Sequence, residues 1–384
     1  MSEEKISKRL LLPVLVGFFI SGYSDIVAPL TGNIIVDLFP REVIGRVNFL
    51  PSMAFLWFLV LAVPIAAFMN RRGRKMAARI GFALSFVGLV VAFAAAFGPS
   101  LTGLFIGFGI LGLGNTFIQM AMNPLLAVIS PKDRMTAYLT VGQIVRNGTL
   151  LLVGPLALLF GAWTGAWQWT LAVYALVALA GNVWFVFVDL PEQRDEHPMG
   201  FAACFGLLRK RMVWISTLGI GAFIVADVGI NFVGGQLIET DHSILSSTGF
   251  YAFRIIGTIV GYFVLTHYSD VKYLRYNMLA ALVVVACMLF TRDADWIYVA
   301  MCAMGFLISC VFATFFAAAT KAVAVRESNG VAGLMVFAIS AGAITCPVCG
   351  GLIAWGGSMT WGLVFPLVAL GYMLWASWQL KVEN

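Results

Sequence analysis

The sequence predicts an all-α integral membrane protein with twelve transmembrane helices in two pseudo-symmetric six-helix bundles. The chain of 384 residues is 61% hydrophobic and 11% charged, with a mean hydropathy of +0.94. A soluble chain carries about 25% charged residues, so this one cannot cover a water-exposed surface. The stretches 80–131, 147–188 and 328–380 contain no ionisable Asp, Glu, Lys, Arg or His, and each can hold two spans of about 20 residues. Soluble enzymes, nucleic-acid-binding proteins and secreted disulfide proteins are excluded.

Twelve apolar runs, separated by turns and charged residues, are the expected helices. Backbone N–H and C=O groups in lipid must pair within the chain, and unbroken apolar runs of this length do so as helices. The expected spans are 10–38, 44–69, 76–98, 101–130, 136–162, 166–190, 211–239, 245–267, 273–291, 295–325, 328–356 and 359–380. An even number of spans places both termini on the same side of the membrane.

The basic residues indicate which side that is. In this arrangement 19 of them fall on the side of the N-terminus, and only Arg41, Arg46 and Arg292 fall on the opposite side. The positive-inside rule then places both termini in the cytoplasm, as in a protein of a bacterial-type inner membrane. The net charge of +6 is a topology signal, and no nucleic-acid partner is expected.

A polar segment, 191–210, divides the chain into two halves. We predict an N-terminal bundle over 1–190, a cytoplasmic linker over 191–210 and a C-terminal bundle over 211–384. The first spans of the two halves are faintly similar, since Gly17-Phe-Phe-Ile and Gly221-Ala-Phe-Ile are each followed by a lone Asp, Asp25 or Asp227. Two related halves are typical of duplicated transporters, although chance resemblance between apolar segments is common.

The sequence contains no constellation typical of an enzyme or a metal site. Its three histidines lie in loops or at the ends of spans. Cys346 and Cys349 form a CxxC pattern, but it lies within an apolar span with no ligand-rich partner, so packing thiols are the favoured interpretation. We expect no catalytic residue, no metal and no cofactor.

Four ionisable residues lie well within the predicted spans: Asp25, Arg146, Asp227 and Arg254. Such residues are costly in lipid and mark candidate functional sites, although ion pairs that hold helices in register are the alternative. Asp25 is followed by Pro29 and Gly32, which can interrupt the helix, and transporters place binding sites at such breaks. A buried carboxyl group can bind and release a proton near neutral pH, so Asp25 is a candidate proton carrier.

Side-chain amides gather on two neighbouring spans. Asn115, Gln119 and Asn123 recur every four residues on the fourth span, and Gln143 and Asn147 flank Arg146 on the fifth. Amides both donate and accept hydrogen bonds, as a polyhydroxylated ligand requires. Hydrogen bonds between helices are the alternative. Asn231 on the seventh span is expected on the opposite wall of the same cavity.

The loop between the second and third spans, Asn70-Arg71-Arg72-Gly73-Arg74-Lys75, resembles the signature D-R-x-G-R-[RK] of the major facilitator superfamily. The resemblance implies a gating loop at Asn70, Arg71, Gly73 and Arg74, within the two-bundle fold of that superfamily. Asn70 replaces the usual Asp, so the charge contact that this Asp makes in relatives is not expected here.

Further segments resemble the fucose/glucose/galactose–proton symporter branch of this superfamily. They are the region of Asp25 and Pro29, Asn115 to Pro124, Leu139 to Asn147, Phe253 to Gly257, and Gly333 to Ile344. The resemblance implies that Asp25 carries a proton. Gln119 stands where the family has a Glu of its proton relay, and an amide cannot titrate. Proton coupling would then need another partner, such as Asp227, or would be altered.

These observations and the resemblance predict a secondary transporter that takes up a monosaccharide with protons by alternating access. We expect Asp25 and Asp227 to take part in proton coupling. Arg146 and Asp227 are expected to form an electrostatic pair or a coupling element. The expected substrate contacts are Gln119, Asn123, Gln143, Arg146, Asn147, Asn231 and Arg254. The alternatives are an efflux pump for amphipathic compounds, or an organic-anion carrier in which Arg146 and Arg254 bind a carboxylate. The expected partners are the sugar, protons and the lipid bilayer, and the chain is expected to be monomeric.

Overall fold

The computed structural model describes residues 8–23, 25–27, 30, 38–39, 44–47, 49–129, 135–189, 201–238, 243–265, 269–323 and 327–380. These residues form helices joined by turns, and no strand occurs among them. The predicted all-α class is therefore confirmed. Pro29, Gly32 and the first ten residues of the predicted linker lie outside the described residues.

The helices follow the predicted spans closely. In the first part of the chain they are α1 (Lys8–Ser21), α3 (Ile44–Val47), α4 (Leu50–Arg72), α5 (Arg74–Phe97), α6 (Leu101–Ile129), α7 (Met135–Thr164) and α8 (Trp169–Phe187). In the second they are α9 (Phe201–Gly206), η4 (Leu207–Arg209), α10 (Arg211–Leu237), α11 (Ser243–Leu265), α12 (Asp270–Met288), α13 (Ala294–Leu307), α14 (Val311–Lys321), α15 (Ser328–Ala338), η6 (Ile339–Ala341), α16 (Gly342–Gly356), η7 (Met359–Leu363) and α17 (Val364–Gln379).

Within the described residues, ten helical stretches are long and apolar enough to cross a membrane. Two shorter apolar helices, Leu10–Ser21 and Leu50–Ala62, correspond to the first two predicted spans. Each of the twelve predicted spans is thus represented by helix. The tenth and eleventh are each divided by a short tightened segment, Ile308–Cys310 and η6 respectively.

The first helix ends earlier than predicted. The sequence favoured a span over 10–38, but α1 ends at Ser21 and is followed by a turn that contains Asp25. The Ser21 hydroxyl donates to the carbonyl of Phe18 at 2.6 Å, and the next amides bond three rather than four residues back. Such local side-chain bonds compete with the helical pattern. The hydroxyl of Tyr23 then donates to the carbonyl of Tyr174 on α8 at 2.9 Å, which fixes the turn.

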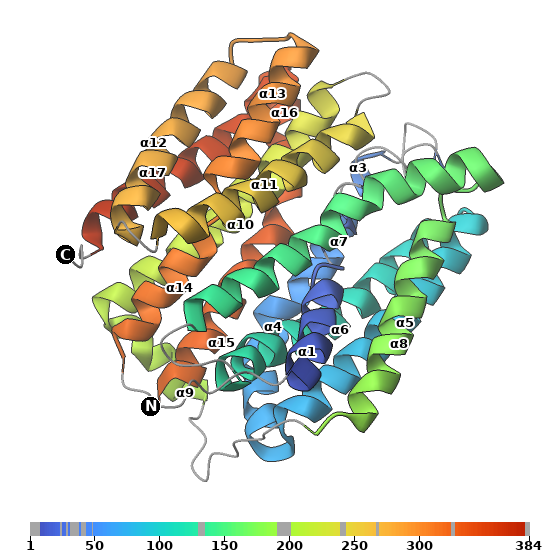
Figure 1. The fold of residues 1–384 in the computed structure, drawn as a ribbon. Helices are drawn as coiled ribbons and strands as arrows, with labels where there is room; N and C mark the ends of the chain where they lie inside the picture. Colours follow the sequence, from blue (N-terminus) through green and yellow to red (C-terminus); the bar gives the residue numbers. More distant parts are fainter. Residues whose placement is uncertain are drawn as a thin grey trace.

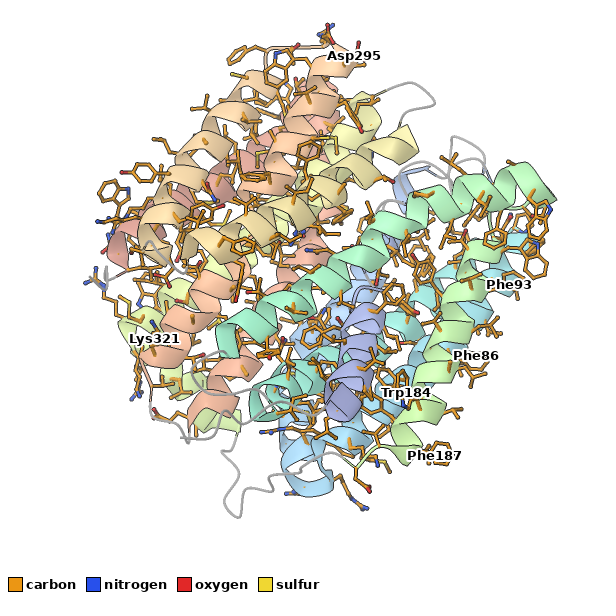
Figure 2. All side chains as sticks on the ribbon, viewed as in Figure 1. Phe86, Phe93, Trp184, Phe187, Asp295 and Lys321 are labelled. Atoms are coloured by element: carbon orange, nitrogen blue, oxygen red, sulfur yellow. The ribbon has the colours of Figure 1, made fainter. Side chains whose placement is uncertain are left out.

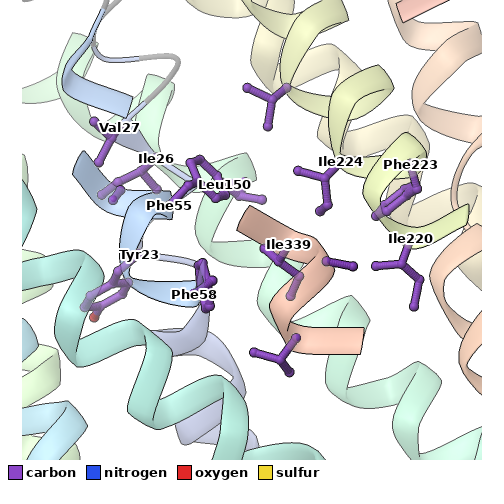
Figure 3. Close-up of a cluster of buried hydrophobic side chains, with 14 of the residues drawn as sticks. Tyr23, Ile26, Val27, Phe55, Phe58, Leu150, Ile220, Phe223, Ile224 and Ile339 are labelled. Carbon is purple, nitrogen blue, oxygen red and sulfur yellow. The ribbon is translucent and has the colours of Figure 1, made fainter. Parts of the chain in front are cut away.

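The helices form two groups that meet along their length (Figure 1). Helices α1 and α4 to α8 pack with one another, and so do α10 to α17; between the groups, α7 lies along α11, and α4 packs against α15, η6 and α16. Apolar side chains fill the space where the groups meet (Figure 3), including Phe55 and Phe58 of α4, Phe223 of α10 and Ile339 of η6. These four side chains are almost fully buried.

The outer surface of the helices is also apolar. Phe187 of α8 projects away from the molecule (Figure 2) and is 80% exposed, and Trp184 on the same helix is 40% exposed. Apolar groups on the outside of a helical bundle are unfavourable in water and favourable in lipid. The surface of α8 is therefore suited to contact with a bilayer.

Candidate functional site

Asp25 and Arg146 form the first of two buried ion pairs. Nη2 of Arg146 donates to Oδ2 of Asp25 at 2.5 Å, and the side chains of Arg146 and Asp25 are 9% and 14% exposed. Asp25 lies in the turn after α1, and Arg146 lies on α7. Charges removed from water are costly unless they are paired, so each of these groups depends on the other for its stability.

Close packing against α7 holds the turn that carries Asp25. A Cβ atom at Gly22 would lie 2.9 Å from the carbonyl oxygen of Arg146, so only glycine permits this approach without displacement. On the same helix, the hydroxyl of Thr149 donates to the carbonyl of Phe19 at 2.5 Å. The end of α1 is thus attached to α7 one turn away from the ion pair.

Asp227 and Arg254 form the second ion pair, between α10 and α11. Nη1 of Arg254 lies 2.7 Å and 2.8 Å from the two carboxylate oxygens of Asp227. The guanidinium carbon also lies 5.1 Å from the ring centroid of Phe223 and 6.0 Å from that of Tyr251, within range of cation–π attraction. The side-chain amide of Asn231 donates to the backbone carbonyl of Asp227 at 2.9 Å.

This pairing differs from the predicted one. The sequence placed Arg146 with Asp227, across the two halves, but the structure pairs Arg146 with Asp25 and Asp227 with Arg254. The physical reason is proximity within each half. The turn after α1 brings Asp25 against α7, and α10 packs directly on α11.

Both arginines line one cavity between the two groups of helices. Its deeper part is lined by Thr140, Gln143, Arg146, Asn147, Phe223, Arg254, Thr258, Tyr262, Ser309, Cys310, Phe312 and Ala313. A second part shares Gln143, Phe312 and Ala313 and continues along Asn123, Leu139, Phe316, Ala317, Thr320 and Lys321.

Each helix of the cavity wall contributes one face. The lining residues of three helices recur at helical spacing: Thr140, Gln143 and Asn147 on α7; Arg254, Thr258 and Tyr262 on α11; Phe312, Phe316 and Thr320 on α14. Three further lining residues were not predicted from the sequence: Thr140, Thr258 and Tyr262. Their spacing from the predicted Gln143 and Arg254, three, four and eight residues, is the signal that could have found them.

The predicted substrate residues divide into two groups. Five line the cavity: Asn123, Gln143, Arg146, Asn147 and Arg254. Gln119 and Asn231 are buried and are not among the lining residues, although Nε2 of Gln119 and Oδ1 of Asn231 have no hydrogen-bond partner within the described part of the chain. The amide stripe on α6 therefore reaches the cavity through Asn123.

The six cysteines are free thiols. No group of three or more His, Cys, Asp or Glu side chains that could hold a metal ion occurs among the described residues. Cys346 and Cys349 are both fully buried within α16. Outside the spans, burial raises the pKa of the Cys204 thiol on α9, which keeps it in the unreactive protonated form.

The sequence of the chain is similar to that of a known protein family. The sequence model described as Major Facilitator Superfamily matches residues 46–345 of the chain. The chain belongs to the major facilitator superfamily. It is therefore a transporter rather than an enzyme, and the two groups of helices are the two six-helix bundles of the major facilitator fold.

Among curated relatives, this major facilitator chain is similar to the glucose/galactose transporters of Brucella abortus biovar 1 (strain 9-941) and Brucella abortus (strain 2308). It is 23% identical to each over 378 residues, which cover 92% of this chain and 89% of the relative. Among solved structures it resembles the E. coli fucose:proton symporter FucP in a variant form, with a TM-score of 0.74, 16% identity and coverage of 97% and 98% of the two chains. A FucP structure in the outward conformation gives a TM-score of 0.75 at 15% identity, with the same coverage. The predicted resemblance to this branch is confirmed.

The signature loop of the superfamily lies between α4 and α5. Gly73 separates the two helices with a φ of +89°, a conformation that residues with a side chain rarely adopt. Arg71 is exposed, whereas Arg74 at the start of α5 is buried. Asn70 is the third-last residue of α4.

Proposed function

We propose that this protein is a secondary active transporter that couples the uptake of a monosaccharide to protons by alternating access. The observation that carries the proposal is the central cavity, where a buried carboxylate–arginine pair lies beside amide and hydroxyl groups. The glucose/galactose transporters and the fucose:proton symporter among its relatives support both the sugar and the proton.

Asp25 is the proposed proton carrier, and Asp227 is a second candidate. Protonation of Asp25 would remove the charge that neutralises Arg146 and so change the partners of that guanidinium. Gln119, which stands where the branch has a Glu, cannot take part in proton transfer. The proposed substrate contacts are Asn123, Gln143, Arg146, Asn147 and Arg254, with Gln119 and Asn231 supporting the site from behind the wall.

The proposed moving units are the bundles 1–190 and 211–384, joined by the linker 191–210. Their meeting surface runs along α7–α11, where the cavity lies, and along α4–α15/α16, where the Ser52 hydroxyl donates to the carbonyl of Ala343 at 2.5 Å. The two bundles can move against each other without breaking a buried ion pair, since Asp25–Arg146 lies within the first bundle and Asp227–Arg254 within the second. In the signature loop, Arg71, Gly73 and Arg74, with Asn70, would control this movement.

The cavity is proposed to face the cytoplasm. Its lining residues come from the first half of α7 and the last halves of α11 and of the α13–α14 span, and these ends lie beside the basic loops. With the positive-inside rule this supports an inner membrane protein whose termini are both cytoplasmic, with the cavity open inward. The bundles complete the cavity within one chain, so we propose a monomer.

Uptake into proteoliposomes tests the proposal. With an acid exterior, labelled glucose, galactose or fucose should accumulate above its external concentration, and a protonophore should abolish the accumulation. Asp25→Asn should exchange sugar across the membrane but not concentrate it. Asp295→Asn, which removes an exposed carboxylate at the start of α13 (Figure 2), is the matched control. Unchanged accumulation by Asp25→Asn would remove Asp25 from the mechanism.

A further inference from the structure

The wall of the cavity carries a charge of one sign. Three of its lining residues are basic, Arg146 and Arg254 in the deeper part and Lys321 in the second part. None of the described residues that line either part is an Asp or a Glu. Asp25 and Asp227 contact the arginines but are not lining residues, so a ligand meets the guanidinium groups and not their counter-ions. The Asp side chains balance the arginines overall, but the guanidinium groups lie nearer to the ligand than the carboxylates do, and this arrangement favours a ligand of negative charge.

The two arginines also retain unused donors. Arg146 and Arg254 are 8% and 7% exposed, and Nε of each lacks a hydrogen-bond acceptor within the described part of the chain. Buried donors without partners are costly, and guanidinium groups bind carboxylates in forked geometry. These Nε atoms are themselves enclosed, so a carboxylate in the cavity would bond to them only after the guanidinium groups turn toward it.

The remaining polar groups suit a hydroxylated ligand. Gln143 and Asn147 provide amides, and Thr140, Thr258 and Ser309 provide hydroxyls around the same space. We propose that the substrate is a sugar acid: a monosaccharide whose carboxylate is bound by Arg146 and Arg254 while its hydroxyls bond to these groups. This inference rests on the proposed sugar transport and specifies its substrate class.

The proton balances the charge of the substrate's carboxylate. In the empty site two Asp and two Arg side chains sum to zero charge. When Asp25 takes up a proton, Arg146 loses its counter-ion, and the sugar carboxylate replaces it. The loaded site is then neutral again, whereas a neutral sugar with a proton would leave one positive charge. The other charged groups near Asp25 are Asp227 and Arg254, on α10 and α11, and that pair remains intact.

Matched sugars differing at one carbon test the inference directly. Galacturonate replaces the CH2OH of galactose by a carboxylate, and glucuronate does the same for glucose. Binding to the purified full-length protein in detergent is measured by tryptophan fluorescence and by thermal stabilisation at pH 6 and pH 8. We expect each acid to bind at least about tenfold more tightly than its neutral partner, as one charge-assisted hydrogen bond provides, and more tightly at pH 6 than at pH 8.

Two variants assign the effect to the cavity. Arg146→Gln should remove most of the preference for the acid. Arg146→Lys keeps the positive charge and should retain part of that preference. The lysine variant also provides the test if the glutamine variant does not fold. Arg292→Gln, which removes an exposed guanidinium between α12 and α13, should bind like the unmodified protein.

Each outcome decides between the two proposals. Binding of galactose without binding of galacturonate overturns the sugar-acid inference and leaves sugar transport standing. Binding of benzoate or succinate as tight as that of galacturonate also overturns it, because the hydroxyl groups would then contribute nothing. Absence of binding by all four sugars overturns both the inference and the proposed function.

Discussion

Replacing Gly22 by alanine tests whether close packing of the first turn against α7 positions Asp25. The added Cβ would lie 2.9 Å from the carbonyl oxygen of Arg146 and 3.0 Å from Cβ of Thr149. The first atom belongs to the backbone of a helix, and Thr149 is held by its hydrogen bond to Phe19, so neither can move away easily. Overpacking of this kind costs about 1–3 kcal/mol. We expect Gly22→Ala to lower the free energy of unfolding by about that amount and to shift Asp25 away from Arg146.

Gly148→Ala on α7, the helix against which Gly22 packs, is the matched control. A Cβ at Gly148 meets no atom within 4 Å. Alanine in a helix is favoured over glycine by about 0.5–1 kcal/mol, so this variant should be neutral or slightly stabilising. Unfolding by sodium dodecyl sulfate in mixed micelles, followed by tryptophan fluorescence, compares the two variants, and proteoliposome uptake at several pH values reports on Asp25. Equal unfolding midpoints and an unchanged pH dependence in Gly22→Ala would refute the reasoning.

Two further predictions concern the second ion pair and the cavity. Arg254→Gln should lower the free energy of unfolding by about 3–5 kcal/mol, because it leaves the carboxylate of Asp227 buried without its partner. The double variant Asp227→Asn/Arg254→Gln should recover much of this loss in the same denaturation assay, and a double variant less stable than both single ones contradicts the pairing. Cys310 lines the cavity, so an anionic methanethiosulfonate reagent applied from the cytoplasmic face should block uptake faster than a cationic reagent of similar size. Cys310→Ser is the control, and a faster cationic reagent would argue against a basic cavity.

The sequence was sufficient for the helices because the membrane imposes a simple rule. Backbone groups in lipid must bond within the helix, so the length of each apolar run approximates the length of the helix. The boundaries of α5, α10 and α12 accordingly lie within three residues of their predicted positions. Within the first span the rule missed a turn: the Ser21 hydroxyl and Gly22 end α1 by local bonding, and helix is present again at Val27 and Leu30. It also missed the divisions at Ile308–Cys310 and η6, since tightened turns leave the apolar pattern unchanged.

The candidate site was only partly predictable. An ionisable side chain within a membrane span carries a high free-energy cost, so such residues stand out in the sequence. This criterion identified all four members of the two buried ion pairs. It did not identify the pairs themselves, because the separation of Asp25 from Arg146 depends on how closely Gly22 approaches α7. Likewise, the amide stripe on α6 was recognised, but only the packing of α6 against its neighbours determines that Asn123 rather than Gln119 lines the cavity.

The sequence by itself thus determined that the chain is a polytopic helical membrane protein. It also indicated the side of the membrane on which the basic loops lie, and it identified the four ionisable residues within the spans. These properties depend on the transfer of single residues between water and lipid, and each residue carries that information wherever it packs. Only the tertiary structure decided that Asp25 bonds to Arg146, that Asp227 bonds to Arg254, and that the charged side chains among the described lining residues of the cavity are all basic. These depend on distances of a few ångströms between helices that are far apart in the chain, and such distances are set by packing.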